Sequence, residues 1–274
     1  MPSFRHPVVA ISHGPGPAWL FSSGPKDLIR DTRPAAQLMS SLLEKLYPND
    51  ENLPKRILFV SAHFESDSSG FEISNASNPD MIYDYYGFPD EAYNVQYPAE
   101  GDPAFAQRVK EQLKKNKIKV KLVNRGYDHG VFVPMTLIRP QADIPIVTLS
   151  INSDLSDQTH FHSTHNLRDF HSRSPALMEG NKAFQYWLDN TLSSDSNLSV
   201  EERTKQITNW RDAPGARYAH PSPNHFMPFV IAAGAGIEDK EAGARAFFRG
   251  WVFRHMALAN LTTSCRSSLL LEQG

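Results

Sequence analysis

Short apolar runs recur along this chain, and each is followed by a polar or turn-forming stretch. Runs of about four to eight apolar residues with such borders are typical of strands buried in a sheet. Pro145 stands at the entry of the longest run, a position where strands tolerate proline. Strands are therefore predicted at residues 8–11, 57–60, 119–123 and 144–151.

Amphipathic stretches lie between these runs. Leu38, Leu42 and Leu46 fall on one face of a helix that Pro34 would begin and Pro48 would end. This helix would join the first two strands in a right-handed βαβ unit. Helices are expected at residues 34–47, 103–116, 176–192 and 195–209, a helical turn at 134–138, and a strand or the start of a helix at 229–233.

This alternation of strands and helices predicts the α/β fold class, with a central, mostly parallel or mixed sheet that helices flank. A length of 274 residues is ample for one large domain. We find no internal repeat and no linker, so a single catalytic domain over residues 1–274 is expected. Side chains that follow the strands would gather at one edge of the sheet, where open α/β folds bind their ligands.

Composition excludes several classes of protein. Hydrophobic residues make up 40% of the chain, charged residues 21%, and the formal net charge is -2. Because the chain lacks a concentrated basic face, binding to nucleic acid or to an anionic membrane is not expected. The single cysteine, Cys265, excludes an internal disulfide framework and cysteine-based metal sites. The sequence shows no secretory leader and no membrane-spanning stretch, so a cytoplasmic location is expected.

Three histidines stand just past predicted strands, namely His13, His63 and His129. One histidine alone is more often a structural residue than a ligand, but the shared placement of three favours a common site. Three neutral imidazoles would hold zinc or iron and leave positions open for water, substrate or oxygen. The pattern therefore predicts a metal site at the strand ends.

Two further stretches leave alternatives open. Residues 81–98 hold many aromatic side chains, which would either close a small satellite core or form a wall for an aromatic ligand. Residues 152–175 hold His160, His162, His165 and His171, whose spacing does not match a helical metal-binding pair. From spacing alone, most of these four histidines are expected on the surface.

Seven short motifs follow one another along the chain. They are Ser12-His13-Gly14-Pro15, Ser61-Ala62-His63, Tyr83-Asp84-Tyr85-Tyr86-Gly87-Phe88-Pro89, Tyr97-Pro98-Ala99, Asp128-His129-Gly130, His165-Asn166-Leu167-Arg168 and His225-Phe226-Met227-Pro228. In this order they resemble the class III extradiol ring-cleavage dioxygenases, and most of all their DOPA 4,5-dioxygenase-like branch. Each motif is weak alone, but together they span most of the chain and form a strong signal.

The resemblance implies roles for five histidines. It makes His13, His63 and His225 the metal ligands. It makes His165 the catalytic acid/base, and His129 the second catalytic histidine, which steadies oxygen or the catecholate. His225 thereby takes the place among the ligands that the strand-end pattern would give to His129. The best-known members of the class use two histidines and a carboxylate, whereas this sequence offers a third histidine.

The resemblance also implies an iron(II)-dependent reaction of a catechol with dioxygen. A catechol would bind iron(II) through both oxygens after a base removes a proton, a task that suits a histidine with a pKa near ~6.5. Ring opening next to the diol would give a muconic semialdehyde, and DOPA would give a product that cyclises to a betalamic-acid-type compound. Three histidines suit zinc(II) equally well, so the resting metal is left open, although zinc cannot cycle electrons.

Two other functions stay open at the level of sequence. A zinc-dependent hydrolase would use three histidines to activate water, and a non-catalytic binding protein would share only the fold. The full set of five histidines favours an enzyme. For a substrate carboxylate, Arg125, Arg168 and Arg217 are candidates, although surface ion pairs explain them as well. The sequence leaves open which catechol is the substrate, which ring bond is cleaved and what the oligomeric state is.

Overall fold

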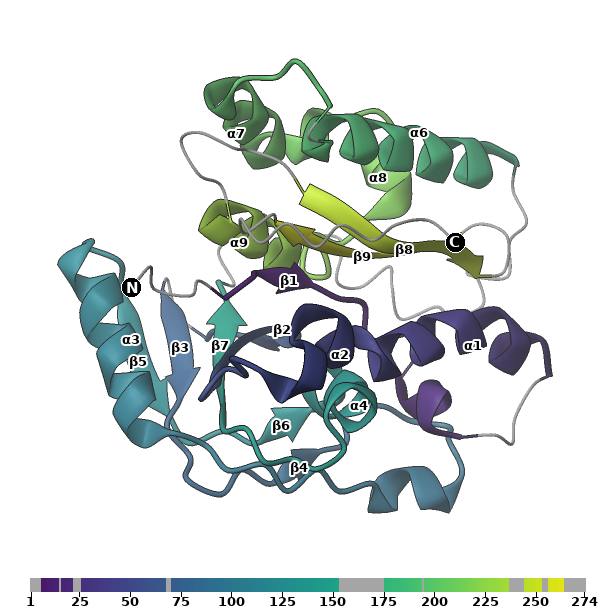
Figure 1. Cartoon of the computed structure of the whole chain (residues 1–274). Helices are drawn as coiled ribbons and strands as arrows, with labels where there is room; N and C mark the ends of the chain where they lie inside the picture. Colours follow the sequence, from purple (N-terminus) through teal and green to yellow (C-terminus); the bar gives the residue numbers. More distant parts are fainter. Residues whose placement is uncertain are drawn as a thin grey trace.

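The computed structural model describes residues 6–14, 16–21, 26–67, 70–152, 175–193, 195–236, 244–252 and 256–263. Figure 1 shows helices arranged around a central sheet, with a second sheet and a further group of helices beside it.

The central sheet contains, in spatial order, β2 (Ile57–Glu65), β7 (Ile146–Ile151), β3 (Phe71–Ser74) and β5 (Val120–Val123). β2 and β7 run parallel, as do β3 and β5, whereas β3 is antiparallel to β7. Every residue of β7 is buried, which suits a strand that has neighbours on both sides and helices on both faces. This mixed sheet confirms the fold class that the sequence predicts.

The first strand lies in a different sheet, so the predicted βαβ unit is wrong. β1 (Val9–Ala10) pairs antiparallel with β9 (Met256–Thr263), which in turn pairs antiparallel with β8 (Ala244–Val252). The backbone groups of β1 therefore bond to residues near the other end of the chain. Local apolar patterning identifies a strand but carries no signal for so distant a partner.

A third, short pair of strands joins two loops. β4 (Met81–Ile82) runs parallel to β6 (Tyr127–Asp128), and Ile82 lies opposite Asp128. The next helix, α4 (His129–Ile138), begins directly after β6. The residues that follow β4 therefore emerge beside the N-terminus of α4.

The predicted helices are present, although several of their ends differ. Pro34 lies inside α1 (Lys26–Ser40) rather than at its start, and α2 (Leu42–Leu46) follows after a break. The helix predicted from residue 195 begins at Val200, because Ser199 and Glu202 form a capping box. The helical turn predicted at 134–138 is the end of the longer α4. The other helices are α3 (Pro103–Lys115), α6 (Pro175–Leu192), α7 (Val200–Thr208), α8 (Ala216–Ala219) and α9 (Met227–Gly236).

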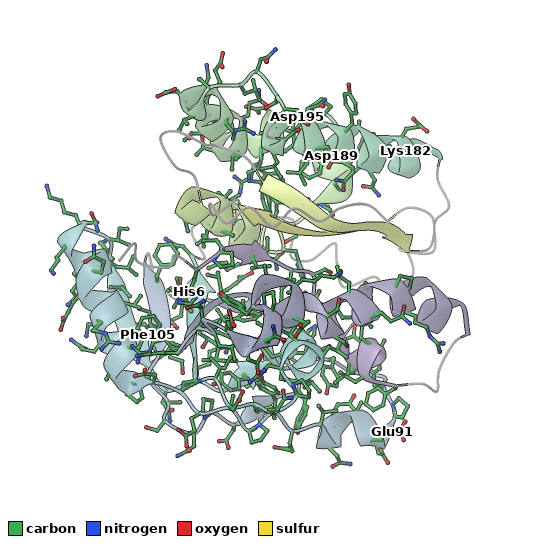
Figure 2. All side chains as sticks on the ribbon, in the orientation of Figure 1. His6, Glu91, Phe105, Lys182, Asp189 and Asp195 are labelled. Atoms are coloured by element: carbon green, nitrogen blue, oxygen red, sulfur yellow. The ribbon has the colours of Figure 1, made fainter. Side chains whose placement is uncertain are left out.

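Each face of the central sheet has its own core. Ile146 packs in the cluster that contains α1, α2 and α4 residues such as Met39 and Phe132. Val147 points to the other face and packs with Ala106 of α3. Phe105, labelled in Figure 2, extends this second cluster, and the Arg56 guanidinium lies 5.2 Å from the centre of its ring.

A third core lies among α6, α7, α8 and α9. Its buried members include Phe184, Leu188, Trp210 and Phe226, and Ala10 of β1 packs against them. Within the described residues, each helix is too short or too polar to span a membrane.

Candidate metal centre

Four histidines from distant parts of the chain lie together. His13 follows β1, His63 lies in β2, His129 is the first residue of α4, and His225 precedes α9. The ring centroid of His13 lies 4.7 Å from that of His63, 4.9 Å from that of His129 and 5.4 Å from that of His225. The fifth predicted histidine, His165, lies outside the described residues.

His63 occupies an irregular part of β2. The regular register with β7 ends at the pair Val60 and Leu149 and resumes at Glu65 and Ile151. Residues 61–64 therefore form a bulge, and a bulge re-aims side chains and interrupts the ladder. The sequence places His63 just past a strand, and the structure places it just past the regularly paired part of one.

The start of α4 approaches this bulge closely. A Cβ atom at Gly130 would lie 2.8 Å from the Ser61 Oγ atom and 3.1 Å from the His63 Cδ2 atom. Because real side chains rarely tolerate such distances, glycine is what allows α4 and β2 to meet here.

A buried polar network holds the backbone of His63. The Ser61 hydroxyl donates to Asp128 Oδ1 at 2.6 Å and accepts from the His63 backbone N–H at 3.2 Å. Arg125 Nη2 donates to the His63 carbonyl oxygen at 3.0 Å and to Asp128 Oδ2 at 3.1 Å. Its guanidinium also lies 4.4 Å from the centre of the Phe64 ring. Arg125 is thus engaged in supporting His63, which weakens its candidacy for a substrate carboxylate.

The other two candidate arginines are Arg217 and Arg168. Arg217 is exposed on α8, and Arg168 lies outside the described residues.

Three of the imidazoles fit one metal ion. Ligand nitrogens of His13, His63 and His225 lie within 4.8 Å of one another, and Nε2 of His13 is 3.2 Å from Nε2 of His63. Two nitrogens that bind one tetrahedral ion at about 2.0–2.1 Å are themselves about 3.3 Å apart. The Nδ1 atom of His225 lies 3.1 Å from the Asn224 Oδ1 atom, which leaves its Nε2 for a ligand.

The same imidazoles are held neutral. Burial, followed by the nearby rings of His129 and His225, lowers the pKa of His63 to about 3. Burial and the His63 ring lower the pKa of His13 well below its usual value. His225 is the most exposed member of the set, yet desolvation of its ring and the nearby His13 lower its pKa to about 3. Neutral imidazole is the form that binds metal, so these three side chains are in the charge state that a metal ion requires.

Asp84, which follows β4, contacts two of the histidines. Its Oδ1 atom lies 2.7 Å from His129 Nδ1 and accepts a hydrogen bond from the His129 backbone N–H at 3.1 Å. Its Oδ2 atom lies 3.3 Å from His63 Nδ1. Burial acts to raise the pKa of Asp84, but its hydrogen bonds from His129 outweigh burial and lower that pKa to about 2.

Sequence reasoning gave Asp84 no role, although it stands in one of the seven motifs. The role of Asp84 follows from its contact with His129, which lies 45 positions away in the chain. The pairing of β4 with β6 creates this contact, and no local sequence pattern predicts that pairing.

His220 is a second residue whose environment the sequence did not indicate. Its ring packs against the rings of Phe184, Trp210 and Phe226, with centroids 5.3, 6.0 and 4.8 Å away. Burial lowers its pKa to about 4.

The aromatic stretch at 81–98 joins the main core and reaches the candidate centre. Tyr83 and Tyr85 pack against the core that contains Met39, Phe132 and Ile146, called the main core below. Their hydroxyls donate to the backbone carbonyl oxygens of Val95 and Ala92. The Tyr85 ring lies edge-on to His129, with centroids 5.7 Å apart. These rings therefore close a core and also border the histidine cluster.

Comparisons with known proteins give a consistent result. Residues 8–174 match a family model described as the catalytic LigB subunit of aromatic ring-opening dioxygenase. The dioxygenase tasH of Hapsidospora irregularis is 35% identical over 270 residues, which cover 86% of this chain and 79% of that protein. A protein of Beta vulgaris named 4,5-DOPA dioxygenase extradiol is 31% identical over 254 residues, which cover 85% of this chain and 87% of that protein.

A solved structure shares the fold. The crystal structure of an uncharacterized protein from Escherichia coli K12 matches with a TM-score of 0.64 at 24% identity, covering 95% of this chain and 100% of the other.

Proposed function

The chain belongs to the family of catalytic LigB subunits of aromatic ring-opening dioxygenases, and on this premise we propose that it opens a DOPA-like catechol at an iron(II) ion held by His13, His63 and His225. Membership makes the chain an extradiol ring-cleavage dioxygenase. Dioxygenases of this family depend on a non-haem metal, and the family implies dioxygen and a small aromatic substrate. The observation that carries the proposal is the convergence of three neutral imidazoles, with ligand nitrogens within 4.8 Å of one another.

Iron(II) in this position would supply open coordination sites for the catechol and dioxygen, and a path for electrons between them. The protein's part is to hold three nitrogen lone pairs at fixed positions. The backbone of His63 is held by its polar network, and the His225 ring is held by Asn224, before a metal arrives.

In our proposal His129 contacts the substrate or dioxygen beside the metal. Its Nδ1 atom is bound to Asp84, so Nε2 is the nitrogen left for a substrate. The His129 ring centroid lies 4.1 Å from that of His63, next to the proposed ligands. In our proposal His129 steadies the ionised catechol or dioxygen, and His165 acts as the acid/base that takes the first catechol proton.

A DOPA-like catechol is the substrate class that similarity supports best. Relatives from Beta vulgaris and Portulaca grandiflora carry the name 4,5-DOPA dioxygenase extradiol, at 31% and 32% identity. The Tyr85 ring beside His129 provides an aromatic edge near the proposed metal, which suits a planar ring.

Oxygen uptake by metal-stripped protein tests this proposal. The protein is reloaded without oxygen with either iron(II) or zinc(II), L-DOPA is added, and oxygen and the visible spectrum are followed. We expect oxygen uptake and a yellow product with iron(II) only, and loss of both in His63→Ala and His165→Ala. The control His6→Ala removes an exposed histidine outside the cluster and should keep the activity.

The opposite result favours a second candidate. Because the three proposed ligands are all histidines, the site also suits zinc(II), which activates water for hydrolysis. Zinc-dependent ester hydrolysis, with no oxygen uptake for any of several catechols, would replace the iron(II) proposal.

A further inference from the structure

The Asp84 carboxylate lies between two histidines with different proposed roles. One oxygen is 2.7 Å from His129 Nδ1, and the other is 3.3 Å from His63 Nδ1. We propose that Asp84 is a positioning residue, which fixes both rings with a proton on Nδ1 and the lone pair of Nε2 turned toward one centre. This inference rests on the proposed function, because it takes His63 as a ligand and His129 as the histidine that contacts substrate.

The chemistry of a carboxylate sets the tautomer. An ionised carboxylate only accepts hydrogen bonds, so the nitrogen 2.7 Å away must carry the proton. In the neutral imidazole of His129, Nε2 is then the unprotonated nitrogen. The Asp84 oxygen near His63 Nδ1 favours the same tautomer there, which leaves the His63 Nε2 lone pair on the side of His13 Nε2, 3.2 Å away.

Asp84 is itself held in place by the start of α4. Asp128, the N-cap residue, makes no side-chain cap hydrogen bond, because its carboxylate accepts from Ser61 and Arg125 instead. The His129 backbone N–H donates to Asp84 Oδ1, so Asp84 supplies an acceptor that the N-cap residue does not. The carboxylate thus has two fixed contacts with His129, one with its ring and one with its backbone.

A direct role for Asp84 as a metal ligand fits less well. His63, Asp84 and His129 form a second group whose ligand atoms lie within 4.8 Å of one another. However, the 2.7 Å between Asp84 and His129 is a hydrogen-bond distance, and two ligands of one tetrahedral ion would lie about 3.3 Å apart. Both contacts of Asp84 also use Nδ1, which leaves the two Nε2 atoms for the shared centre. Carboxylates that hold metal-binding histidines in this way are a common support for metal sites.

The first test is a direct observation of the rings in wild-type protein. Protein labelled with ¹⁵N only in its histidines is stripped of metal and examined by ring-nitrogen NMR at neutral pH, with signals assigned through His63→Gln and His129→Gln. We expect the Nδ1–H tautomer for both His63 and His129. An Nε2–H tautomer at either residue would overturn the proposal, whatever the activity of the enzyme.

The second test removes one acceptor. In Asp84→Asn the carboxamide offers a single acceptor oxygen, so it can hold at most one of the two rings in the Nδ1–H tautomer. We expect at least one of the two rings to lose its single tautomer, and zinc(II) affinity, measured by chelator competition, to fall about 10–100-fold. The matched control Asp80→Asn makes the same charge change at an exposed position in the same segment and should leave tautomers and affinity as in wild type.

Unchanged tautomers and unchanged zinc(II) affinity in Asp84→Asn would contradict the proposal. Should this variant fail to fold, the wild-type ring signals decide the question by themselves. The outcome is also separable from the proposed function. Absence of oxygen uptake in wild type would refute the dioxygenase proposal and leave the NMR result standing, whereas an Nε2–H tautomer with intact uptake would refute only the role of Asp84.

Discussion

His63 and His225 can serve as ligands because their rings stay neutral far below the pH at which a free histidine takes up a proton. Their pKa values lie at about 3, and the first cause in both cases is desolvation. The rings also disfavour charge on one another, since each lies within 5.4 Å of His13 by ring centroid. Binding of a divalent cation relieves this crowding of lone pairs, which is the physical reason that the cluster suits a metal.

His220 gives the clearest pH prediction, because its ring is packed among three aromatic rings and it is not one of the proposed ligands. Its folded-state pKa is about 4, against about 6.5 for an unfolded histidine. Between these values the unfolded chain binds a proton that the folded protein does not, so stability falls as the pH drops. From pH 7 to pH 5 this one residue should cost about 2 kcal/mol of unfolding free energy.

Urea denaturation of metal-free protein at the two pH values measures this effect. His220→Phe keeps a ring among Phe184, Trp210 and Phe226 and removes the titrating group. We expect the variant to lose less stability between pH 7 and pH 5 than wild type, by about 2 kcal/mol. Equal pH dependence of the two proteins would show that His220 is not kept neutral by the fold.

At this scale, sequence reasoning could locate part of the site. His13, His63 and His129 stand near strand ends, and the structure brings all three together. His225 lies before a helix, so only the family resemblance could point to it. Asp84 could not be identified from its neighbours along the chain, because its proposed role follows from its contacts with His63 and His129, which are distant in sequence.

Two elements, β2 and α4, bring the parts of the site to their positions. The bulge at 61–64 re-aims His63, and α4 begins with His129 at the same place. Their close approach depends on Gly130, where a side chain would meet both Ser61 and His63. Since the atoms in the way belong to a buried network, they have little room to move.

Gly130→Ala should therefore damage the site rather than stabilise the helix. We expect zinc(II) affinity to fall at least tenfold and the unfolding free energy to fall by about 1–3 kcal/mol, the usual cost of overpacking. The matched control is Gly234→Ala in α9, where an added Cβ meets nothing within 4 Å. That variant should keep its affinity and gain up to about 1 kcal/mol. Equal affinities in the two variants would contradict the importance of this contact.

Element positions were more predictable than element partners. The strands predicted at 57–60 and 144–151 and the helix at 103–116 follow from apolar spacing, and they are present. The strand at 144–151 is buried as expected, whereas residues 57–60 are partly exposed. The partner of β1 could not be predicted, because β9 lies near the opposite end of the chain. Pro34 suggested a helix start from local rules, but α1 continues through it.

The whole molecule places the candidate centre where two cores meet. Figure 1 shows β1 between the central-sheet region and the group formed by α6 to α9. Val9 and Ile11 pack on the main core, whereas Ala10 packs on the core among the later helices. His63 lies in the central sheet, beside the main core, and His225 lies next to Phe226 of the core among the later helices. One ion bound to both histidines would therefore link the two cores.

A metal that links both cores should stabilise the protein as a whole. At zinc(II) concentrations 100 times the Kd, binding should add about 2.7 kcal/mol, which raises the Tm by roughly 5–10 °C for a chain of this size. His225→Ala should lose most of this increase in Tm, because the variant keeps His13 and His63 but lacks the ligand next to the core of the later helices. Calorimetry with and without zinc(II) checks this, and an equal rise in Tm for the variant would contradict the proposed ligand set.

Anomalous X-ray diffraction from crystals loaded with iron(II) or zinc(II) tests the central claim most directly, because it locates the ion against named side chains. We predict one anomalous peak about 2.0–2.1 Å from a ring nitrogen of each of His13, His63 and His225, with Asp84 outside the coordination sphere. A peak between His63, Asp84 and His129, or the absence of a peak at the three-histidine cluster, would contradict the account of this site.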